Sequence, residues 1–394
     1  MIISGQFNDS LAPIMDGVAI TAQNYAFWLN KKYSPSFAIG PRVPGYRDSQ
    51  EHILRFASLP IQRKGPYRLG LPRIDRSFNE RIETIPFDIV HAHCPFVSGG
   101  YALSLSKKRN IPMVATFHSK YRDDFARWLP LDTPLDQLIK LIVQFYDSAD
   151  AVWVPNEAII DTLRSYGYKG PVDYVPNGSD IAVQENEDRK ELIRSGRQLL
   201  RTDDSSPVFL YVGQHRWVKN IRRIIEALKI LHDRGMDFQM RFVGNGSDLQ
   251  EMENLVRKPG LREKVQFIGP VYDRKELKAI YSTADLFLFP SLYDNASLAT
   301  REAAGLSVPT VFIEGATTAN GVVDKVNGFL SSDTSEAYAD KITEILADRD
   351  LLRKTGEGAY RDLYRSWESV AGIVFDKYNQ LIEEYKFMKL KKIS

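Results

Sequence analysis

Two carboxylates late in the chain, Asp294 and Glu302, have a spacing suited to a charged ligand that also carries hydroxyl groups. They stand in SLYDNASLATREAAG, where a strand-like run over 284–291 gives way to a short alanine-rich helix. A helix N-terminus offers free N–H groups and partial positive charge, which suit a diphosphate. Asp294 would lie just before that N-terminus and Glu302 about two turns further on. The pattern favours a nucleotide-sugar, with plain surface charge as the alternative.

A second candidate segment, VGQHRWVKN over 212–220, also follows a predicted strand. Arg216 and Lys219 are three residues apart, so both side chains could face one ligand. Two cations beside a helix N-terminus would balance the charge of a diphosphate. The alternative is a pair of solvated basic residues on a surface turn.

The segment GNGSD over 244–248 joins a predicted strand to a predicted helix. Gly244 and its neighbour Asn245 would let backbone amides come close to a phosphate or a sugar. The segment fails the GxGxxG pattern because Leu249 takes the last position. An ordinary strand-to-helix turn therefore explains it equally well.

The first half of the chain carries three histidines near strand ends, His91 and His93 in HAH and His118 in TFHSKY. Alternate strand residues point the same way, so HAH could hold a metal ion. The sequence contains no third ligand at comparable spacing and no HExxH or CxxC motif, which favours packing or polarity at a cleft. His118, at the end of the next strand, could hydrogen-bond a sugar hydroxyl.

Other chemistries lack their motifs in this sequence. It contains no GxSxG elbow, no GxxxxGK[ST] loop and no DxD element that suggests a metal-held diphosphate. The single cysteine, Cys94, excludes an intrachain disulfide, and neighbouring strand residues face opposite ways, which argues against a thiolate–imidazole pair with His93. We expect no metal and no cofactor.

Composition indicates an ordinary globular protein. The chain has 394 residues, 43% hydrophobic and 26% charged, which is enough for two domains with separate cores. A formal net charge of +2 implies no general attraction to nucleic acid. The N-terminus has no signal-peptide pattern, and no apolar run approaches the roughly 20 residues that span a bilayer. We therefore expect a cytoplasmic protein.

Short apolar runs alternate with helical patterns, which is typical of α/β proteins with parallel sheets. Expected strands in the first half cover 1–4, 87–93, 112–118, 151–155 and 172–177. Those in the second half cover 207–213, 240–246, 265–269, 284–291 and 309–313. The polar stretch 179–206 is the expected boundary, and 365–386 reads as one long amphipathic helix. Open α/β sheets bind ligands at the carboxyl ends of their strands, so we expect a cleft between two such edges.

Two basic stretches could contact an anionic membrane, each near-surface cation contributing about 1 kcal/mol. The first, over 55–81, contains Arg55, Arg63, Lys64, Arg68, Arg73, Arg76 and Arg81. The second is the tail, with Lys386, Lys389, Lys391 and Lys392. A solvated loop and a frayed C-terminus are equally good readings.

With these motifs in order, the chain resembles the family 4 retaining glycosyltransferases of GT-B fold over nearly its whole length. The resemblance rests on DGVA, DIVHAHCPF, TFHSKY, SADAVWVPN, VPNGSD, YVGQHRWVKN, FVGNG, FIGPV, FPSLYDNASLATREAAGLSVPTVF, NGFL and SWE. It implies two Rossmann-like domains with parallel sheets facing across a central cleft. The expected parts are an acceptor-side domain over 1–180, a nucleotide-sugar domain over 181–365 and a helix over 366–394 that crosses back to the first domain and ends in a basic tail.

The resemblance also implies residue roles. The residues assigned to catalysis are His118, Asp294 and Lys219. The residues assigned to the donor are Gly17, Arg216, Lys219, Gly244, Asn245, Pro270, Val271, Asp294, Asn295, Ala296, Ser297, Leu298 and Glu302. Glu302 would hold the ribose, Asp294 the donor sugar, and the backbone at Pro270 and Val271 the base. Members of the family need no divalent metal, and retention is explained by same-face attack in which the leaving phosphate takes the acceptor's proton.

Three positions depart from the family pattern: Asp294 where glutamate is usual, Gln214 where arginine is usual, and Asp16 where glycine is frequent. Within the family the first half looks most like the bacterial enzymes that glycosylate diacylglycerol. The expected activity is therefore transfer of a hexose, with UDP-glucose as the expected donor, to a lipid or glycan at the inner face of the cell membrane. The alternatives are a nucleotide-sugar epimerase of the same fold and a non-catalytic nucleotide-sugar-binding partner in glycan assembly.

Overall fold

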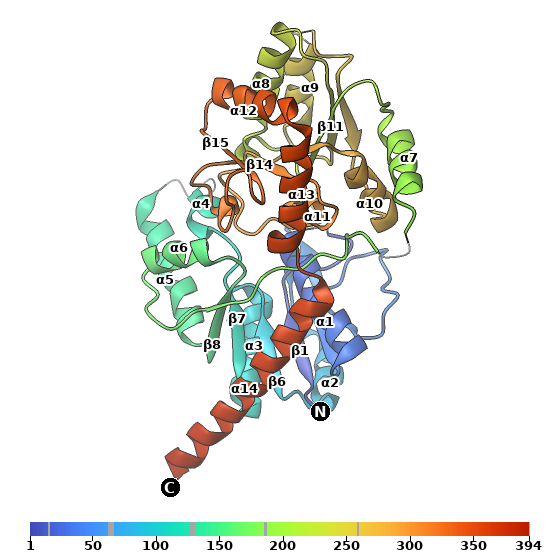
Figure 1. Cartoon of the computed structure of the whole chain (residues 1–394). Coiled ribbons are helices and arrows are strands. Elements are labelled where there is room, and N and C mark those ends of the chain that lie inside the picture. The colour runs from blue at the N-terminus through green and yellow to red at the C-terminus, as the bar shows by residue number, and fades with distance from the viewer. Residues whose placement is uncertain (15, 62–66, 127–130, 185–186, 258–259, 394) are drawn as a thin grey trace. The chain divides into compact units, whose positions relative to one another are not determined.

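The computed structural model describes residues 1–14, 16–61, 67–126, 131–184, 187–257 and 260–393. Contacts between Cα atoms divide the chain into two compact units. Unit 1 is Met1–Gly178 together with Trp367–Ser394, and unit 2 is Ser179–Ser366. Figure 1 shows both units with their labelled elements.

Unit 1 is built on a parallel sheet with the order β3-β2-β1-β6-β7-β8-β9, seven strands among the described residues. The strands are β1 (Ser4–Phe7), β2 (Ser36–Pro41), β3 (Ile53–Phe56), β6 (Ile89–Ala92), β7 (Met113–Thr116), β8 (Ala151–Val154) and β9 (Asp173–Tyr174). Strand β1 lies between β2 and β6, with Phe7 opposite Ile39 on one side and Ala92 on the other. Because the central strands are buried on both faces, they read as apolar runs in the sequence.

Helices cover this sheet, and the last of them, α14, packs against α1 (Figure 1). The helices are α1 (Gly17–Lys32), α2 (Arg76–Thr84), α3 (Val97–Arg109), α4 (Tyr121–Ala126), α5 (Asp132–Asp147), α6 (Ile160–Ser165) and α14 (Trp367–Ile393), with 3-10 turns η1 (Pro72–Ile74) and η2 (Glu157–Ile159). Trp367, Val370, Ala371, Val374 and Tyr378 of α14 are buried. In the described part of the chain, no helix combines the length and apolar character needed to cross a membrane.

Unit 2 contains a second parallel sheet, with the order β12-β11-β10-β13-β14-β15 and six strands among the described residues. The strands are β10 (Val208–Val212), β11 (Gln239–Val243), β12 (Val265–Gly269), β13 (Leu286–Leu288), β14 (Thr310–Ile313) and β15 (Phe329–Ser331). The helices are α7 (Arg189–Leu200), α8 (Ile221–Asp233), α9 (Leu249–Arg257), α10 (Arg274–Thr283), α11 (Leu298–Gly305), α12 (Ser335–Ala347) and α13 (Arg349–Leu363), with η3 (Trp217–Lys219) and η4 (Thr317–Ala319). The predicted α/β class with parallel sheets is confirmed.

The polar stretch 179–206, interpreted from the sequence as a boundary, contains helix α7 and belongs to unit 2. Helix α7 packs closely on α10. A Cβ atom at Gly196 would lie 2.0 Å from the carbonyl oxygen of Ala279, so the close approach of the two helices depends on glycine. The polar residues that suggested a linker cover the outer face of this helix.

The first expected strand is shifted along the chain. The sequence predicted residues 1–4, whereas β1 covers Ser4–Phe7 and includes the fully buried Gln6. Glutamine in the middle of a buried strand is atypical and weakens the apolar pattern there. Hydrogen bonds from the Gln6 amide to Ser4 and Ser36 explain how the strand accommodates it.

Asp16 begins helix α1 as its N-cap. Its carboxylate accepts hydrogen bonds from the Ala19 N–H at 2.7 Å and from the Ser10 hydroxyl at 2.7 Å. One of the four N–H groups that a helix leaves unpaired is thereby satisfied. This local role accounts for an aspartate at a position where the family resemblance leads one to expect glycine.

We expect Asp16→Ala to lower the free energy of unfolding by about 1 kcal/mol, because it removes the cap of α1. Asp16→Asn is the matched control, since its amide oxygen keeps the acceptor and should retain most of the stability. Urea denaturation followed by circular dichroism measures both variants. Equal stability of Asp16→Ala and the unchanged protein would contradict a capping role.

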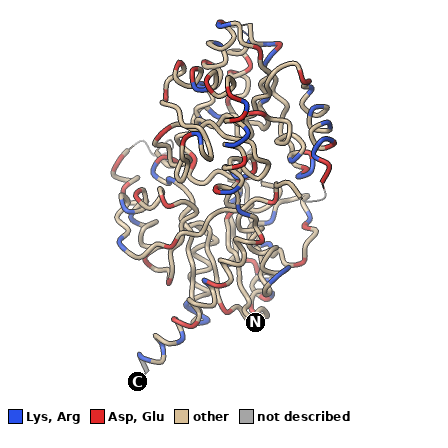
Figure 2. The backbone as a smooth tube through the Cα atoms, viewed as in Figure 1, with Lys and Arg blue, Asp and Glu red and all other residues tan. Residues whose placement is uncertain are grey.

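The basic stretch over 55–81 is not a continuous cationic surface. The Arg55 side chain is 9% exposed and donates to Asp48 and to the carbonyl oxygens of Pro41 and Ala12. Arg55 therefore anchors the fold, which corrects its expected membrane contact. Arg63 and Lys64 lie outside the described residues, as does the side chain of Lys392. Figure 2 shows positive and negative residues intermingled in both units.

A small antiparallel hairpin, β4 (Ser58–Pro60) and β5 (Arg68–Gly70), lies within the same stretch. Leu59 pairs with Leu69 across it, and the two side chains are 55% and 47% exposed. Ile61 and Tyr67, next in the alternation, are also exposed. One face of the hairpin thus presents apolar side chains to solvent, with Arg68 on the intervening position of β5.

Candidate functional site

In unit 2, the loops that leave the carboxyl ends of β10 and β13 meet through a charged pair. The Lys219 ammonium contacts Asp294 Oδ1, and its Nζ lies 4.8 Å from the centre of the Tyr293 ring. Ser291, which is fully buried, donates to Asp294 Oδ2 at 2.6 Å. The side chains of Lys219 and Asp294 are 12% and 20% exposed, so the pair is held in place yet open at one side. The structure brings together two residues that the sequence had placed 75 positions apart.

Helix α11 begins at Leu298, four residues after Asp294. Its N-cap, Ser297, makes no side-chain hydrogen bond to the helix, so the first-turn N–H groups at Leu298 and beyond are not capped by it. Asn295, Ala296 and Ser297, which connect Asp294 to the helix, are partly buried, as is Leu298, the first residue of α11. The N–H groups of a first helical turn suit an anion, and this turn begins four residues after the partner of Lys219.

Arg216 adds a second cation to the same loop. It precedes η3, is partly buried, and its side chain makes no hydrogen bond or ion pair with the residues that the structure describes. Gln214, where the family usually carries arginine, is exposed. Arg216 is therefore the cation of this loop available to a ligand besides Lys219.

The glycines of GNGSD allow two neighbouring loops to pack closely against each other. A Cβ atom at Gly244, whose φ is +133°, would lie 2.0 Å from the Gly213 carbonyl oxygen, and one at Gly246 would lie 2.2 Å from that of His215. Asn245 accepts the His215 N–H through its backbone oxygen at 2.9 Å. These glycines let the loop after β11 press against the loop that carries Arg216 and Lys219, which explains their presence without a ligand.

The loop also contains His215, whose importance the sequence motif did not reveal. Its side chain is fully buried against the rings of Tyr211, Phe242 and Phe267. Neither ring nitrogen has a hydrogen-bond partner among the described residues. Burial lowers the pKa of His215 to about 4, so the ring is neutral near pH 7 and packs as an aromatic side chain.

Glu302 is more engaged than the sequence suggested. It is 6% exposed, accepts the Tyr281 hydroxyl at 2.9 Å on one oxygen and pairs with Arg274 at 2.8 Å on the other. Arg274 also pairs with Asp180. Burial raises the pKa of Glu302, and Arg274 acts against that rise. A carboxylate has about four lone-pair sites, so two remain for a ribose, and that role stays a prediction.

We expect Glu302→Gln to lower the free energy of unfolding by about 2 kcal/mol, because the amide keeps an acceptor for Tyr281 but loses the charge that faces Arg274. Glu336→Gln, at an exposed position on α12, is the control and should stay within about 0.5 kcal/mol. Urea denaturation measures both. If the two variants are equally stable, the ion pair between Glu302 and Arg274 does not contribute to the free energy of unfolding.

The remaining residues that the sequence assigned to the donor lie just after β12. Pro270 is exposed and Val271 partly buried, directly after Gly269, whose φ is +85°. Their backbone follows the same carboxyl edge of the sheet that carries the loops after β10 and β11. The sequence predicted this shared edge for parallel strands.

In unit 1, His118 follows β7 and Gly17 is the first residue of α1. The HAH residues point the same way, as predicted, with ring centres 4.2 Å apart. All four of their ring nitrogens contact protein atoms: Tyr378 and Thr116 for His91, His118 and Gln6 for His93. Packing rather than metal binding therefore explains the motif. Among the described residues, no cluster of three or more His, Cys, Asp or Glu could hold a metal ion.

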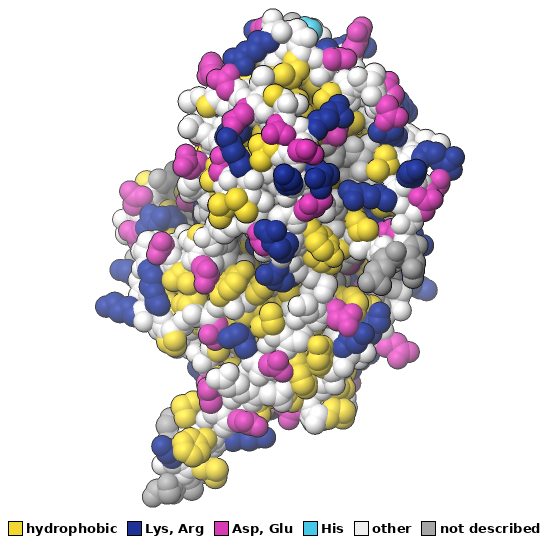
Figure 3. Space-filling model, viewed as in Figure 1, with side chains coloured by type: hydrophobic (Ala, Val, Ile, Leu, Met, Phe, Trp, Pro, Cys, Tyr) yellow, Lys and Arg dark blue, Asp and Glu magenta, His cyan; other side chains and the backbone are white. Residues whose placement is uncertain are grey.

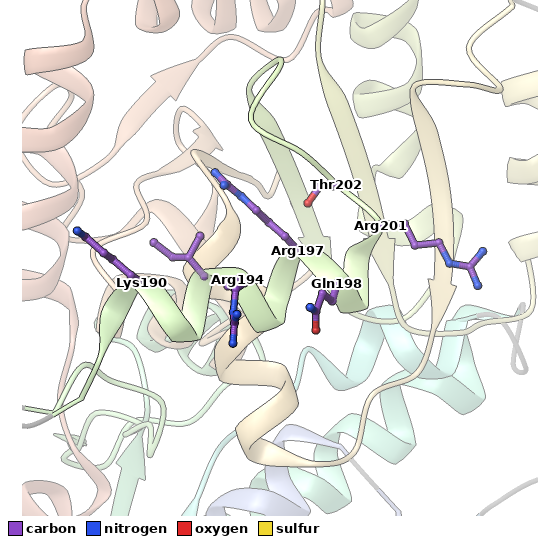
Figure 4. A pocket seen from close by; sticks show the side chains of 7 residues that line it. Lys190, Arg194, Arg197, Gln198, Arg201 and Thr202 are labelled. Atoms are coloured by element: carbon purple, nitrogen blue, oxygen red, sulfur yellow. The ribbon is translucent and has the colours of Figure 1, made fainter.

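An open hollow of about 570 Å³ lies along α7, away from the predicted residues (Figure 4). Lys190 and Arg197 extend to one side of the helix, and Arg194 and Gln198 to the other. Arg194 pairs with Glu191, and Arg197 contacts Asp204. None of the residues assigned to the donor lines this hollow, and its cations form a solvated helix surface.

Comparison with known proteins matches both halves of the chain to glycosyltransferase families. Residues 15–183 match the model described as Glycosyltransferase Family 4, and residues 193–362 match Glycosyl transferases group 1. The α-monoglucosyldiacylglycerol synthase of Streptococcus pneumoniae is 22% identical over 360 residues, covering 89% of this chain and 80% of the relative. The D-inositol 3-phosphate glycosyltransferase of Corynebacterium glutamicum is 25% identical over 326 residues, covering 78% and 75%.

Solved structures share the fold. Sucrose-phosphate synthase from Thermosynechococcus elongatus superposes with a TM-score of 0.79 at 20% identity, covering 98% of this chain and all of that one. Anabaena HepE in complex with UDP and glucose gives 0.73 at 16% identity, covering 96% and 99%. The two α/β units and these matches define a glycosyltransferase with the GT-B fold. The chain belongs to the family 4 glycosyltransferases, as the sequence motifs predicted.

Proposed function

We propose that this glycosyltransferase transfers a hexose, with retention and without a divalent metal, from a nucleoside diphosphate sugar, UDP-glucose, to a lipid or glycan at the cytoplasmic face of the cell membrane. The observation that carries the proposal is the meeting of Lys219 and Asp294 beside the start of α11. The loops after β10 and β13 together offer a cation for a diphosphate, a carboxylate for sugar hydroxyls and the N–H groups at the start of α11.

The charges of this cluster suit a donor without a metal. A nucleoside diphosphate leaves with about two negative charges, which Lys219 and Arg216 neutralise while the amides of α11 hydrogen-bond its oxygens. Asp294 positions Lys219, and its carboxylate, whose side chain is 20% exposed, is the proposed acceptor for a sugar hydroxyl. The leaving phosphate takes the acceptor's proton on the face from which it departs, which is how the anomeric configuration is retained.

Two relatives support the substrates. One is named for α-glucosylation of diacylglycerol, and one solved structure with the same fold holds UDP and glucose. These two proteins support UDP-glucose as the donor and a lipid as the acceptor for this chain.

The exposed apolar face of the β4–β5 hairpin and the end of α14 supply membrane contacts in this proposal. Phe387, Met388 and Leu390 of α14 are exposed, and Lys386, Lys389 and Lys391 alternate with them. Figure 3 shows apolar and basic side chains side by side at this end of the helix. Apolar groups enter the headgroup region while cations meet anionic lipids.

Nucleotide release from UDP-, GDP- and ADP-sugars, with and without a bacterial lipid extract, tests the activity. We expect release of UDP from UDP-glucose only with lipid, a new glycolipid mass, an α-glucosidic product by NMR, and no loss of rate with EDTA. An inverted product or abolition by EDTA contradicts the proposed mechanism. Absence of turnover with every donor and acceptor contradicts the proposed reaction.

Flotation with vesicles tests the membrane contact. Vesicles of phosphatidylglycerol and phosphatidylcholine should retain the protein, and vesicles of phosphatidylcholine alone should not. Replacing Leu59 and Leu69 by Asp should abolish flotation, whereas the control Leu141→Asp, at an exposed position of α5, should not. Unchanged flotation of the double variant rules out the hairpin as the contact.

A further inference from the structure

Asn220, the residue that follows Lys219, lies between η3 and α8 in unit 2. Its backbone is left-handed, with a φ of +57°, a conformation that asparagine adopts more readily than most residues. Asn220 stands at the N-cap position of α8, where an asparagine side chain commonly accepts a helix N–H. Its side chain makes no hydrogen bond of that kind. The amide of Asn220 therefore serves contacts outside the helix.

Two acceptors fix the orientation of the Asn220 amide. Its nitrogen donates to the Pro290 carbonyl oxygen at 3.1 Å and to Asp333 Oδ1 at 3.0 Å. A carbonyl oxygen and a carboxylate oxygen only accept hydrogen bonds, so the amide nitrogen, and not its oxygen, must face both of them. The two N–H groups of the amide match these two acceptors in number.

Asp333, in the segment between β15 and α12, is itself held in place by Arg223 of α8. Arg223 Nε donates to Asp333 Oδ1 at 2.9 Å, and Nη2 donates to the Asp333 carbonyl oxygen at 2.8 Å. The Arg223 Nη1 group donates to the Ser335 hydroxyl at 2.7 Å. A planar guanidinium with three such bonds has little freedom to turn. Asn220 therefore binds an acceptor whose position is fixed by the neighbouring helix.

The other acceptor belongs to the segment that carries the partner of Lys219. Pro290 is buried and directly precedes Ser291, whose hydroxyl donates to Asp294 Oδ2 at 2.6 Å. The Ser291 carbonyl oxygen accepts the Thr318 hydroxyl at 3.1 Å. The loop after β10 and the segment after β13 are thus joined twice, by the Lys219–Asp294 ion pair and by the Asn220–Pro290 hydrogen bond.

We propose that Asn220 is a positioning residue that holds the Lys219 ammonium against Asp294 by linking the loop after β10 to the segment after β13. The inference rests on the proposed function and deepens it, because it names a residue that keeps Lys219 oriented for the diphosphate. A preorganised group has to stay within about 0.5 Å of its productive position. Without the amide, the backbone at Lys219 can shift away from Asp294, and the cation is no longer in place when the ligand binds.

Calorimetric titration of the full chain with UDP measures this effect without turnover. Asn220→Gly removes the amide and still permits the left-handed backbone, so we expect the Kd for UDP to rise about three- to tenfold. Asn110→Gly is the matched control: Asn110 has a φ of +62° at the end of α3 in unit 1, and this variant should leave the Kd unchanged. Asn220→Asp turns an oxygen toward both acceptors and should weaken UDP binding at least as much as Asn220→Gly.

A double-mutant cycle separates positioning of Lys219 from a general structural role. Lys219→Met alone should raise the Kd for UDP about 10- to 100-fold. In the Lys219→Met background, Asn220→Gly should change the Kd by less than about twofold, because no ammonium remains to be positioned. An equal loss in both backgrounds overturns the inference, since Asn220 would then act independently of Lys219.

The remaining outcomes also decide. Unchanged UDP binding by folded Asn220→Gly and Asn220→Asp overturns the inference and leaves the proposed function intact. Unchanged binding by Lys219→Met removes Lys219 from the donor site, and the proposed function and this inference then fail together. If circular dichroism shows that neither Asn220 variant folds, Asn220 supports the fold as a whole, and its assignment to the position of Lys219 is wrong.

Discussion

Lys219→Met should lower turnover of the sugar donor by about 10²- to 10³-fold, the range measured when one preorganised group that stabilises developing charge is removed. The Lys219 ammonium is held by Asp294 beside the start of α11, so it is already oriented before a ligand arrives. Methionine keeps the stem of the side chain and removes the charge. The departing diphosphate then loses its best-placed counter-charge, and the step in which the sugar bond breaks becomes slower.

The control for this prediction is Lys229→Met on α8. Lys229 pairs with Asp233 at the surface, and its side chain is 55% exposed. This variant should keep turnover within about twofold, because an exposed pair contributes little. The rate of nucleotide release is measured at donor concentrations well above and well below KM. Turnover of Lys219→Met comparable to that of Lys229→Met would remove Lys219 from the site, and normal circular dichroism of both variants would exclude misfolding.

Unit 1 should be markedly sensitive to acid. His91, His93 and His118 have pKa values lowered by burial, that of His118 to about 3, against an ordinary value of 6.5. In the unfolded chain the same histidines bind protons below about pH 6.5, so their contribution to stability is complete above that pH and is lost as the pH falls. For each buried neutral histidine, the free energy of unfolding falls by up to about 1.4 kcal/mol for every unit by which the pH drops below 6.5.

We therefore expect the free energy of unfolding of unit 1 to fall by several kcal/mol between pH 7 and pH 5. Urea denaturation followed by tryptophan fluorescence reports it, because Trp153 is buried with its ring centre 5.0 Å from that of His91. Burial raises the pKa values of the Asp9 and Asp16 carboxyls, which therefore act in the opposite sense as the pH falls.

The histidine contribution is separated with His118→Gln. This variant should reduce the slope of stability against pH by the share of one histidine, while His232→Gln, in α8 of unit 2, leaves it unchanged. A slope that is the same in both variants would show that other groups govern the acid response. Unfolding should be followed with separate probes for the two units, since two-unit chains need not unfold in one step.

The sequence by itself determined the α/β class and most sheet strands, because a strand buried on both faces reads as a short apolar run wherever it occurs. It also placed Lys219, Asp294 and His118 in segments that follow strands β10, β13 and β7, where ligand residues of parallel sheets usually lie, and their roles stay predictions. It missed β2, β3 and β15, whose short segments contain serine, glycine, proline or arginine.

Only the tertiary structure decided which partner each polar group has. Arg55 looked like a surface cation until Asp48 and two carbonyl oxygens enclosed it. Glu302 looked open until Arg274 and Tyr281 occupied both oxygens, and Gln6 contacts Tyr378, 372 positions away. Periodicity is a local property that encodes burial, whereas the neutralisation of a charge or the sharing of a proton depends on atoms brought together by the folded chain.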